Sequence, residues 1–306
     1  MGWFAALIAA VWTIVSGLSP HAGTSPVPGT FSHQAHIIFG GDMLFDRSVR
    51  TTIEQKGGDF IFSCMDPVLS KASLVVANLE GPITDNPSVS QASAPGDGNN
   101  YTFTQPTITG PLLYAHNVRL VNIGNNHMLN FSRPGLLQTK SYLDAAGVGY
   151  FGDPDALEAD KVARITVGGV NFSFVNWSDW TSDNTDHTVA QVRAEAKSGR
   201  VVVVYTHWGI EYAPSSTPRM QALAHQFVDA GASIVIGSHP HVVEEHERYH
   251  GVDIYYSLGN FIFDQFWEPA VDHGLMLDVG FSWAGVASVR EIPIVIGRDR
   301  RPCPVE

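Results

Sequence analysis

The chain is poor in cysteine and in positive charge. Two cysteines, Cys64 and Cys303, occur among its 306 residues, and no CxxC pair is present, which excludes a zinc site built from cysteines. The two can pair in an oxidising compartment, but we expect them to stay free. Lys and Arg number 18 against 30 Asp and Glu, which gives a net charge of −12. Nucleic-acid binders normally carry a basic patch, so this balance argues against DNA or RNA as a partner.

The chain also lacks an internal repeat and any charged run typical of a tail, and its 44% hydrophobic and 10% aromatic residues are ordinary for a globular protein. Residues 2–18 carry no charge, and this length is close to the lower limit for a bilayer span. A buried core helix is the alternative, but we expect residues 1–20 to be an export signal or membrane anchor and residues 21–34 a linker. Residues 35–306 are then one extracytoplasmic domain, either secreted or held at the membrane through the N-terminus.

Apolar runs alternate with amphipathic segments after the linker. Nearly continuous β-branched runs, typical of strands covered on both faces, occupy residues 35–42, 73–81, 118–127, 201–209 and 233–241. Pro near the start and Gly at the end predict helices over residues 134–147 and 217–231. Further strand-like runs lie at residues 161–167, 170–177, 252–263 and 274–281. The pattern predicts a layered α/β fold with a mixed sheet or two packed sheets, and residues 85–100 are expected to form a polar surface loop or active-site flap.

Polar residues able to bind metal or phosphate stand at the carboxyl end of each of the first five runs. They are Asp42, Asn78 with Glu80, Asn125 to His127, His207, and His239 with His241. Ligands of open α/β sheets collect outside the carboxyl ends of the strands, so these groups are expected to point toward one region. Taken singly, each also has an ordinary structural interpretation, such as a helix cap for Asp42 or a solvated turn for Glu80.

The SHPH segment is the hardest of these to interpret as purely structural. In an extended segment residues i and i+2 point the same way, and Pro240 stiffens the link between His239 and His241. His246 and His250, in the same stretch, are expected to be exposed polar positions.

The candidate metal ligands combine two carboxylates, one amide oxygen and three imidazoles. They are Asp42, Glu80, Asn126, His207, His239 and His241. This mixed set suits Mn, Fe or Zn better than Ca or Mg, which prefer oxygen alone. Six candidates can serve one divalent ion or two ions that share a bridging carboxylate, as in many sites that cleave phosphoesters.

Six stretches in a fixed order resemble the CapA (PgsA) family of poly-γ-glutamate capsule proteins. They are GGDMLFDR (40–47), ANLEGPIT (77–84), NIGNNHMLN (122–130), YTHWGIEY (205–212), IGSHPHV (236–242) and YSLGNFIFDQ (256–265). The family's domain is similar to the calcineurin-like metallophosphatases. The resemblance therefore implies a four-layer α/β/β/α sandwich of the metallo-dependent phosphatase type, anchored in the membrane and facing outward.

The resemblance also implies metal-binding roles for individual residues. Asp42 matches the family's first acidic position, and Glu80 stands where metallophosphatases place a bridging aspartate. Asn126 matches their amide ligand. The remaining imidazole ligands of those enzymes are matched by His207, His239 and His241.

Catalytic and substrate-binding roles follow from the same resemblance. His127 matches the metallophosphatase general acid, and Arg47 closes the first motif as an anion contact. The expected substrate contacts are Asn125, Trp208, Asn260 and Asp264. The sequence departs from the patterns in three places: Leu44 replaces the DxH histidine, Glu80 is one methylene longer than aspartate, and Asn130 stands where the family usually has aspartate.

Three functions remain open. The first is a capsule protein that hydrolyses or transfers amide bonds of an anionic polymer similar to poly-γ-glutamate, with a bound ion activating water or the carbonyl. The second is a phosphoesterase that acts on a small extracellular ester with the same residues. The third is a non-catalytic, polymer-binding subunit of a membrane synthase or export complex. Because both the polymer and the protein are acidic, attraction has to be local, through the metal and Arg47.

Overall fold

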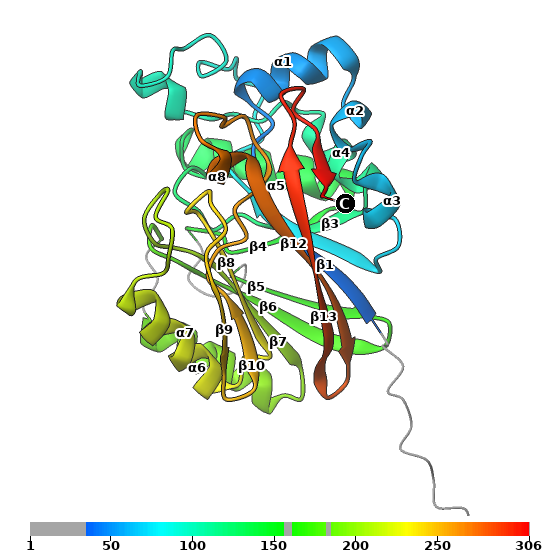
Figure 1. The fold of residues 1–306 in the computed structure, drawn as a ribbon, viewed down its shortest axis with the longest axis vertical. Coiled ribbons are helices and arrows are strands. Elements are labelled where there is room, and N and C mark those ends of the chain that lie inside the picture. The colour runs from blue at the N-terminus through cyan, green and yellow to red at the C-terminus, as the bar shows by residue number, and fades with distance from the viewer. Residues whose placement is uncertain (1–34, 156–160, 182–184, 306) are drawn as a thin grey trace, which may run out of the picture. The chain divides into compact units, whose positions relative to one another are not determined.

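The computed structural model describes residues 35–155, 161–181 and 185–305. The expected export signal or anchor (residues 1–20) and the linker (residues 21–34) lie outside these ranges. Within them, no helix has the length and apolar character needed to cross a membrane. The strands of the described residues form two sheets (Figure 1).

The first sheet has the strand order β14-β13-β12-β1-β2-β3-β4, and β11 pairs with β1. Strands β1 to β4 are parallel, whereas β12, β13 and β14 form an antiparallel half. The bounds are β1 Ala35–Met43, β2 Leu74–Leu79, β3 Val118–Asn122, β4 Gly149–Phe151, β11 Asn260–Ile262, β12 His273–Ser282, β13 Gly285–Ile296 and β14 Pro302–Pro304. Its central strands are buried on both faces, which explains their continuous apolar runs.

The second sheet has the strand order β5-β6-β7-β8-β10-β9. Strands β6, β7, β8 and β10 are parallel, and the edge strands β5 and β9 pair antiparallel with their neighbours. The bounds are β5 Val162–Val167, β6 Val170–Ser178, β7 Val201–His207, β8 Ile234–Ser238, β9 His246–Tyr249 and β10 Val252–Tyr255. His246 and His250 are exposed in and after β9, as the sequence predicted.

The two sheets pack face to face with helices on both outer sides (Figure 1). Between the sheets, Phe39 and Val76 of the first pack in one cluster with Phe174 and Val203 of the second. The outer face of the first sheet is covered by α1 Arg47–Lys56, α2 Asp59–Phe62, α3 Asp66–Leu69, α4 Thr109–Ala115 and α5 Ser132–Ala146. The outer face of the second is covered by α6 Thr185–Lys197 and α7 Pro218–Ala230. This order confirms the predicted α/β/β/α sandwich.

Local signals fix the ends of α7 where the sequence predicted them. The Thr217 hydroxyl accepts a hydrogen bond from the Met220 backbone N–H at 3.2 Å, and Pro218 is the first helical residue. Gly231 ends the helix at φ 112°, a left-handed conformation that glycine adopts without strain. Helix α5 likewise matches the helix predicted over residues 134–147, although it starts at Ser132, slightly earlier than expected.

The polar segment 85–100 is a loop that runs into the 3₁₀ turn η1 Gly98–Tyr101. The Ser90 hydroxyl in this loop donates to Asp46 Oδ2 at 2.7 Å. Asp46 occupies the N-cap position of α1, so the alternative in which Asp42 caps that helix is wrong. The short α8, Pro269–Asp272, precedes β12.

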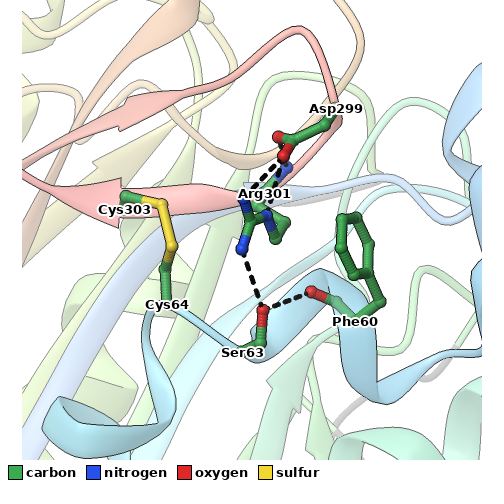
Figure 2. Close-up of a disulfide and its surroundings, with 6 residues drawn as sticks. All are labelled: Phe60, Ser63, Cys64, Asp299, Arg301 and Cys303. Carbon is green, nitrogen blue, oxygen red and sulfur yellow. Dashed lines mark hydrogen bonds and ion pairs between the residues drawn. A yellow bond between two sulfur atoms is a disulfide. The ribbon is translucent and has the colours of Figure 1, made fainter.

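Cys64 and Cys303 form a disulfide, so the expectation that they stay free was wrong (Figure 2). The bond joins the segment after α2 to β14, and the two Cα atoms lie 5.0 Å apart although 239 positions separate them in the sequence. Only the pairing of β14 with β13 brings Cys303 to this place. The spacing along the chain therefore carried no information about the pairing.

Candidate metal centre

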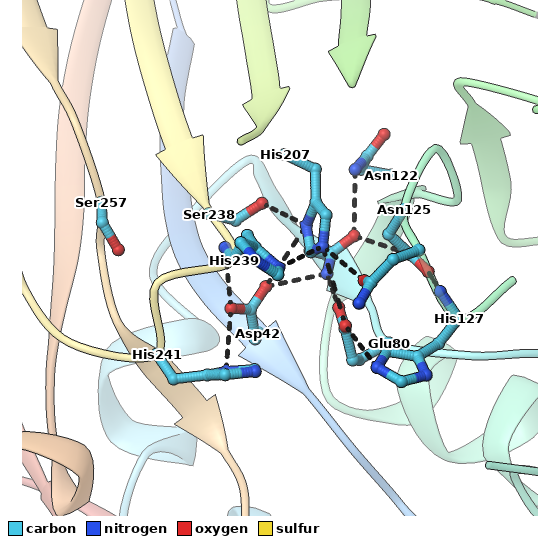
Figure 3. Close-up of polar contacts among 12 residues, drawn as sticks. Asp42, Glu80, Asn122, Asn125, His127, His207, Ser238, His239, His241 and Ser257 are labelled. Atoms are coloured by element: carbon cyan, nitrogen blue, oxygen red, sulfur yellow. Dashed lines mark hydrogen bonds and ion pairs between the residues drawn. The ribbon is translucent and has the colours of Figure 1, made fainter. Parts of the chain in front are cut away.

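Asp42, Glu80 and His207 each bring a ligand atom to within 4.8 Å of the others. Asp42 lies in β1, Glu80 directly follows β2 and His207 ends β7, so both sheets contribute to the group. All three side chains are fully buried. Figure 3 shows them turned toward a common point, with His239 and His127 beside them. Residues remote in sequence thus converge at the carboxyl ends of the strands.

One carboxylate oxygen in this group lacks a protein partner. Glu80 Oε1 is buried and takes part in no hydrogen bond with the described residues. Its nearest ring nitrogens are His207 Nε2 at 3.7 Å and His127 Nε2 at 3.8 Å. Because leaving such an oxygen unsatisfied costs about 1–3 kcal/mol or more, a ligand is expected to supply the missing interaction. The donor set of carboxylates and neutral imidazoles fits a divalent transition-metal ion.

The pKa shifts in this group are those expected of a site that binds a cation. Burial raises the pKa of Glu80 well above its usual range, and the charge of Asp42 adds to this. Burial also lowers the pKa of His207 well below its usual range and lowers that of His239 to about 2. Both imidazoles are therefore neutral at neutral pH, which is the form that binds metal. A cation between the two carboxylates would offset their mutual repulsion.

The SHPH segment forms a turn around Asp42. His239 and His241 have φ angles of 99° and 61°, so both lie in the left-handed region, and the expected extended geometry was wrong. The turn aims the His239 backbone N–H at Asp42 Oδ2 (3.1 Å) and places His239 Nδ1 3.2 Å from His207 Nε2. His241 Nδ1 lies 3.3 Å from Asp42 Oδ2. Strained conformations of this kind persist where surrounding contacts hold them, often at functional sites.

Asn126 and His127 bring the loop after β3 to the same place. Asn126 Oδ1 lies 2.8 Å from His207 Nε2. His127 packs its ring 4.3 Å from that of Phe103, and its Nδ1 lies 3.2 Å from Asn130 Oδ1. The departure at position 130 thus replaces a carboxylate partner of His127 with an amide oxygen. Burial lowers the pKa of His127 to about 4.

Three asparagines lie under the two carboxylates: Asn78 was among the strand-end candidates, whereas Asn122 and Asn176 were passed over by the sequence interpretation. Asn78 Nδ2 donates to Asp42 Oδ1 at 2.8 Å and also to Glu80 Oε2. Asn78 Oδ1 accepts from Asn122 at 2.9 Å, and Asn176 in turn donates to Asn122 at 2.9 Å. The sequence signal that could have found these residues was an asparagine at the end of an apolar strand. A buried amide there needs hydrogen-bond partners, and neighbouring strand ends supply them.

Three expected substrate contacts serve the interior instead. Trp208 is fully buried and its indole N–H donates to the Tyr256 carbonyl at 2.9 Å, so it packs in the core and the prediction was wrong. Asn125 is buried and donates to Asn78 Oδ1 and the Leu79 carbonyl. Asn260 is also fully buried, and its Oδ1 lies 2.9 Å from Nδ1 of His241. Asn125 and Asn260 therefore position other groups of the site. Sequence alone could not separate a strand-end amide that faces substrate from one that faces the protein.

Arg47 and Asp264 do line a cleft, which has a volume of about 270 Å³ and also includes Tyr101, Tyr212 and Trp267. Arg47 Nη2 pairs with Asp264 Oδ1 at 2.5 Å, so much of the guanidinium charge is already neutralised. The same guanidinium lies 5.2 Å from the centre of the Phe103 ring, which also contacts His127. The cleft therefore adjoins the candidate metal centre.

Aromatic side chains beside the histidines were also missed. Trp180 is partly exposed and its ring centre lies 4.0 Å from that of His239. Tyr212 lies 6.0 Å from His241 in a stacked arrangement and 5.2 Å from Trp267. Exposed aromatics beside polar groups are typical of binding sites, but their position next to the histidines depends on the fold.

Comparison with known proteins identifies the family. Residues 36–265 match the model of the bacterial capsule synthesis protein family PGA_cap. The chain belongs to this family. It is 31% identical to the PGA biosynthesis protein CapA of Bacillus subtilis (strain 168) over 83% of this chain and 71% of that protein. It is 29% identical to the capsule biosynthesis protein CapA of Bacillus anthracis over 88% of this chain and 68% of that protein.

A solved structure supports the architecture of this PGA_cap protein. The crystal structure of a hypothetical protein from Thermus thermophilus superposes with a TM-score of 0.55 at 17% identity, covering 84% of this chain and 98% of that chain. At this identity the likeness concerns the fold alone. The resemblance to the CapA family and the metallophosphatase-like fold are both confirmed.

Proposed function

We propose that this PGA_cap protein is an extracytoplasmic, metal-dependent hydrolase or transferase that acts on an anionic γ-glutamyl polymer during capsule synthesis. The names of its two Bacillus relatives support the polymer and the process. The observation that carries the metal-dependent chemistry is the buried, unpartnered Glu80 Oε1 between two imidazoles and close to Asp42.

The residues that would hold the ion are Asp42, Glu80 and His207, with Asn126 and His239 next to them. A divalent ion held there supplies a Lewis acid and lowers the pKa of bound water. Asn78 fixes both carboxylates through its amide, so their oxygens are oriented before any ligand arrives.

His127 is the candidate for proton transfer. Asn130 Oδ1 can only accept, so the neutral imidazole carries its proton on Nδ1 and leaves Nε2 free to take one. Its low pKa keeps it neutral at pH 7. His127 would therefore first act as a base, taking at Nε2 the proton that the attacking water or acceptor group loses, and then as an acid, donating that proton to the leaving amine.

The test offers purified full-length protein poly-γ-glutamate, short γ-glutamyl peptides and phosphomonoesters, with added Mn²⁺ or with a chelator. We expect Mn²⁺-dependent release of amino groups from the γ-glutamyl substrates. His239→Ala should abolish it, whereas the same change at exposed His250 should not. Turnover that persists in chelator or in His239→Ala would contradict the proposal.

Two other functions remain candidates because specific observations favour them. The metallophosphatase-like fold favours a phosphoesterase, which the same assay would reveal as turnover of the phosphomonoesters alone. The capsule-synthesis relatives also favour a non-catalytic subunit of a membrane synthase or export complex. Polymer retention without turnover, and cellular polymer output unchanged in Asp42→Asn, would identify that role.

The extracytoplasmic location has independent support. Disulfides persist mainly in oxidising compartments, and Cys64 is bonded to Cys303. Alkylation of intact cells followed by non-reducing electrophoresis should find both thiols protected. Free, alkylated thiols in most of the protein would contradict an oxidising location.

A further inference from the structure

A turn rich in arginine connects β13 to β14. Residues 298–301 read Arg-Asp-Arg-Arg, which places three of the chain's 18 basic residues within four positions of a protein with net charge −12. The turn lies beyond the residues that match the PGA_cap model, which end at 265. It is therefore a feature of this chain that the family assignment does not explain.

Two of these arginines form no ion pair with a carboxylate of the described residues, although the charges of Asp264 and Asp299 act on Arg300. Arg301 pairs with Asp299 at 2.8 Å (Figure 2). In contrast, the described residues place no carboxylate within ion-pair distance of Arg298 or Arg300. Both guanidinium groups lie over one ring, that of Phe266, at 4.8 Å and 4.7 Å from its centre. Two like charges on one ring repel each other, so an anion between them would be attracted.

The two guanidinium groups are held in place before any ligand arrives. Arg298 Nη2 donates to the Phe266 carbonyl at 3.2 Å, and Arg300 Nε donates to Ser48 Oγ at 2.7 Å. The disulfide ties Cys303, two positions after Arg301, to the segment that follows α2. Ordered cations lose less conformational entropy on binding than free surface side chains do.

The arginine turn is joined to the cleft beside the candidate metal centre. Ser48 Oγ accepts from Arg300 and donates to Asp264 Oδ2 at 2.8 Å. Ser48 and Asp264 both line that cleft together with Arg47. A polyanion lying over Arg298 and Arg300 would thus be close to the wall of the cleft at Ser48 and Asp264.

We propose that Arg298 and Arg300 form an outer binding site for a polycarboxylate chain and lead it into the cleft lined by Arg47. This rests on the proposed function, because it takes the anionic polymer as the ligand. It also resolves the conflict between an acidic protein and an acidic polymer, since attraction is local at a site that the net charge conceals. The contact through Ser48 with the cleft wall favours a polymer over a membrane surface.

The test measures binding of fluorescently labelled poly-γ-glutamate to the full-length protein in chelator, by anisotropy at low and high salt. We expect the double variant Arg298→Ala/Arg300→Ala to bind long polymer roughly tenfold more weakly than wild type at low salt, with the difference shrinking at high salt. The pair Arg298→Lys/Arg300→Lys, which keeps the charge, should recover part of the affinity.

A matched control and the results that would overturn the inference complete the test. Arg248→Ala/Arg290→Ala removes the same charge from exposed arginines that pair with Asp253 and Asp278, and should bind like wild type. Equal loss in this control, or no loss in the Arg298 and Arg300 variant, would overturn the inference. Arginine-dependent binding to phosphatidylglycerol vesicles but not to polymer would overturn it in favour of a membrane surface. If the protein hydrolysed nothing yet bound polymer through these arginines, only the proposed enzymatic activity would fail.

Discussion

Replacing Glu80 with glutamine should raise the stability of the metal-free protein and abolish its stabilisation by metal. The ligand atoms of Asp42 and Glu80 lie within 4.8 Å of each other and both side chains are fully buried. Two unit charges at that distance repel by about 3–4 kcal/mol at an effective dielectric constant of about 20. Burial and Asp42 raise the pKa of Glu80, so partial protonation already relieves some of this repulsion in the wild type. We therefore expect Glu80→Gln to gain about 1–3 kcal/mol in chelator.

Added metal should make the wild type more stable than the Glu80→Gln variant, the reverse of their order in chelator. Metal at 100 times its dissociation constant stabilises the wild type by about 2.7 kcal/mol, which for a chain of this size raises Tm by about 4–5 °C. Glutamine offers a neutral oxygen in place of a carboxylate, so the variant should gain little. Thermal unfolding followed by circular dichroism, with chelator and with Mn²⁺, measures both effects.

A matched control separates the site from a general effect of charge. Glu54→Gln makes the same change at an exposed position of α1, and it should leave Tm nearly unchanged in chelator and keep the full Mn²⁺ response. If Glu80→Gln lowered Tm in chelator and still responded to Mn²⁺ as the wild type does, the metal-centre reasoning would be refuted.

Three further predictions concern stability. Cys64→Ser/Cys303→Ser, which opens a loop of 239 positions, should lower the free energy of unfolding by on the order of 4 kcal/mol in chemical denaturation, and reductant should have the same effect on wild type alone. Trp208→Ala should cost about 3–5 kcal/mol yet leave the Mn²⁺ affinity of the folded protein unchanged by calorimetry; a large loss of affinity would return Trp208 to the site. Burial, with the nearby Glu245, raises the pKa of Glu244 to about 8, so its stabilising contribution is complete below about pH 4.5 and lost as pH rises through about 8. Glu244→Gln should therefore exceed wild type in stability by on the order of 3 kcal/mol more at pH 9 than at pH 4, and parallel pH profiles would contradict this.

Most of the buried strands and the helices α5 and α7 were predictable because their signals are local, whereas α6, as long as α7, was not predicted. The strand β7 reads as an unbroken β-branched run, and α7 is marked by Thr217, Pro218 and Gly231, which fix its ends through short-range hydrogen bonds and φ angles. The geometry of the SHPH turn was not predictable in the same way. His239 takes a left-handed conformation because Asp42, from another strand, accepts its backbone N–H.

Burial decided which candidate residues face a ligand. Trp208 and Asp264 both lie within stretches that resemble the CapA family. Trp208 is nevertheless enclosed in the core, whereas Asp264 lines a cleft. A sequence motif gives the chemical type of a side chain and its order along the chain. It does not say on which side of a strand end the packed helices leave open space.

The sequence by itself determined the inventory: strand-end carboxylates, amides and imidazoles in a fixed order, enough to indicate a metal-binding chemistry and the PGA_cap family. Only the tertiary structure decided which of them meet, that Cys64 bonds to Cys303, and that Arg300 reaches Ser48 at the wall of the cleft. The physical reason is that distances between residues remote in the chain are set by strand order and register. These depend on the packing of both sheets together and on no single segment.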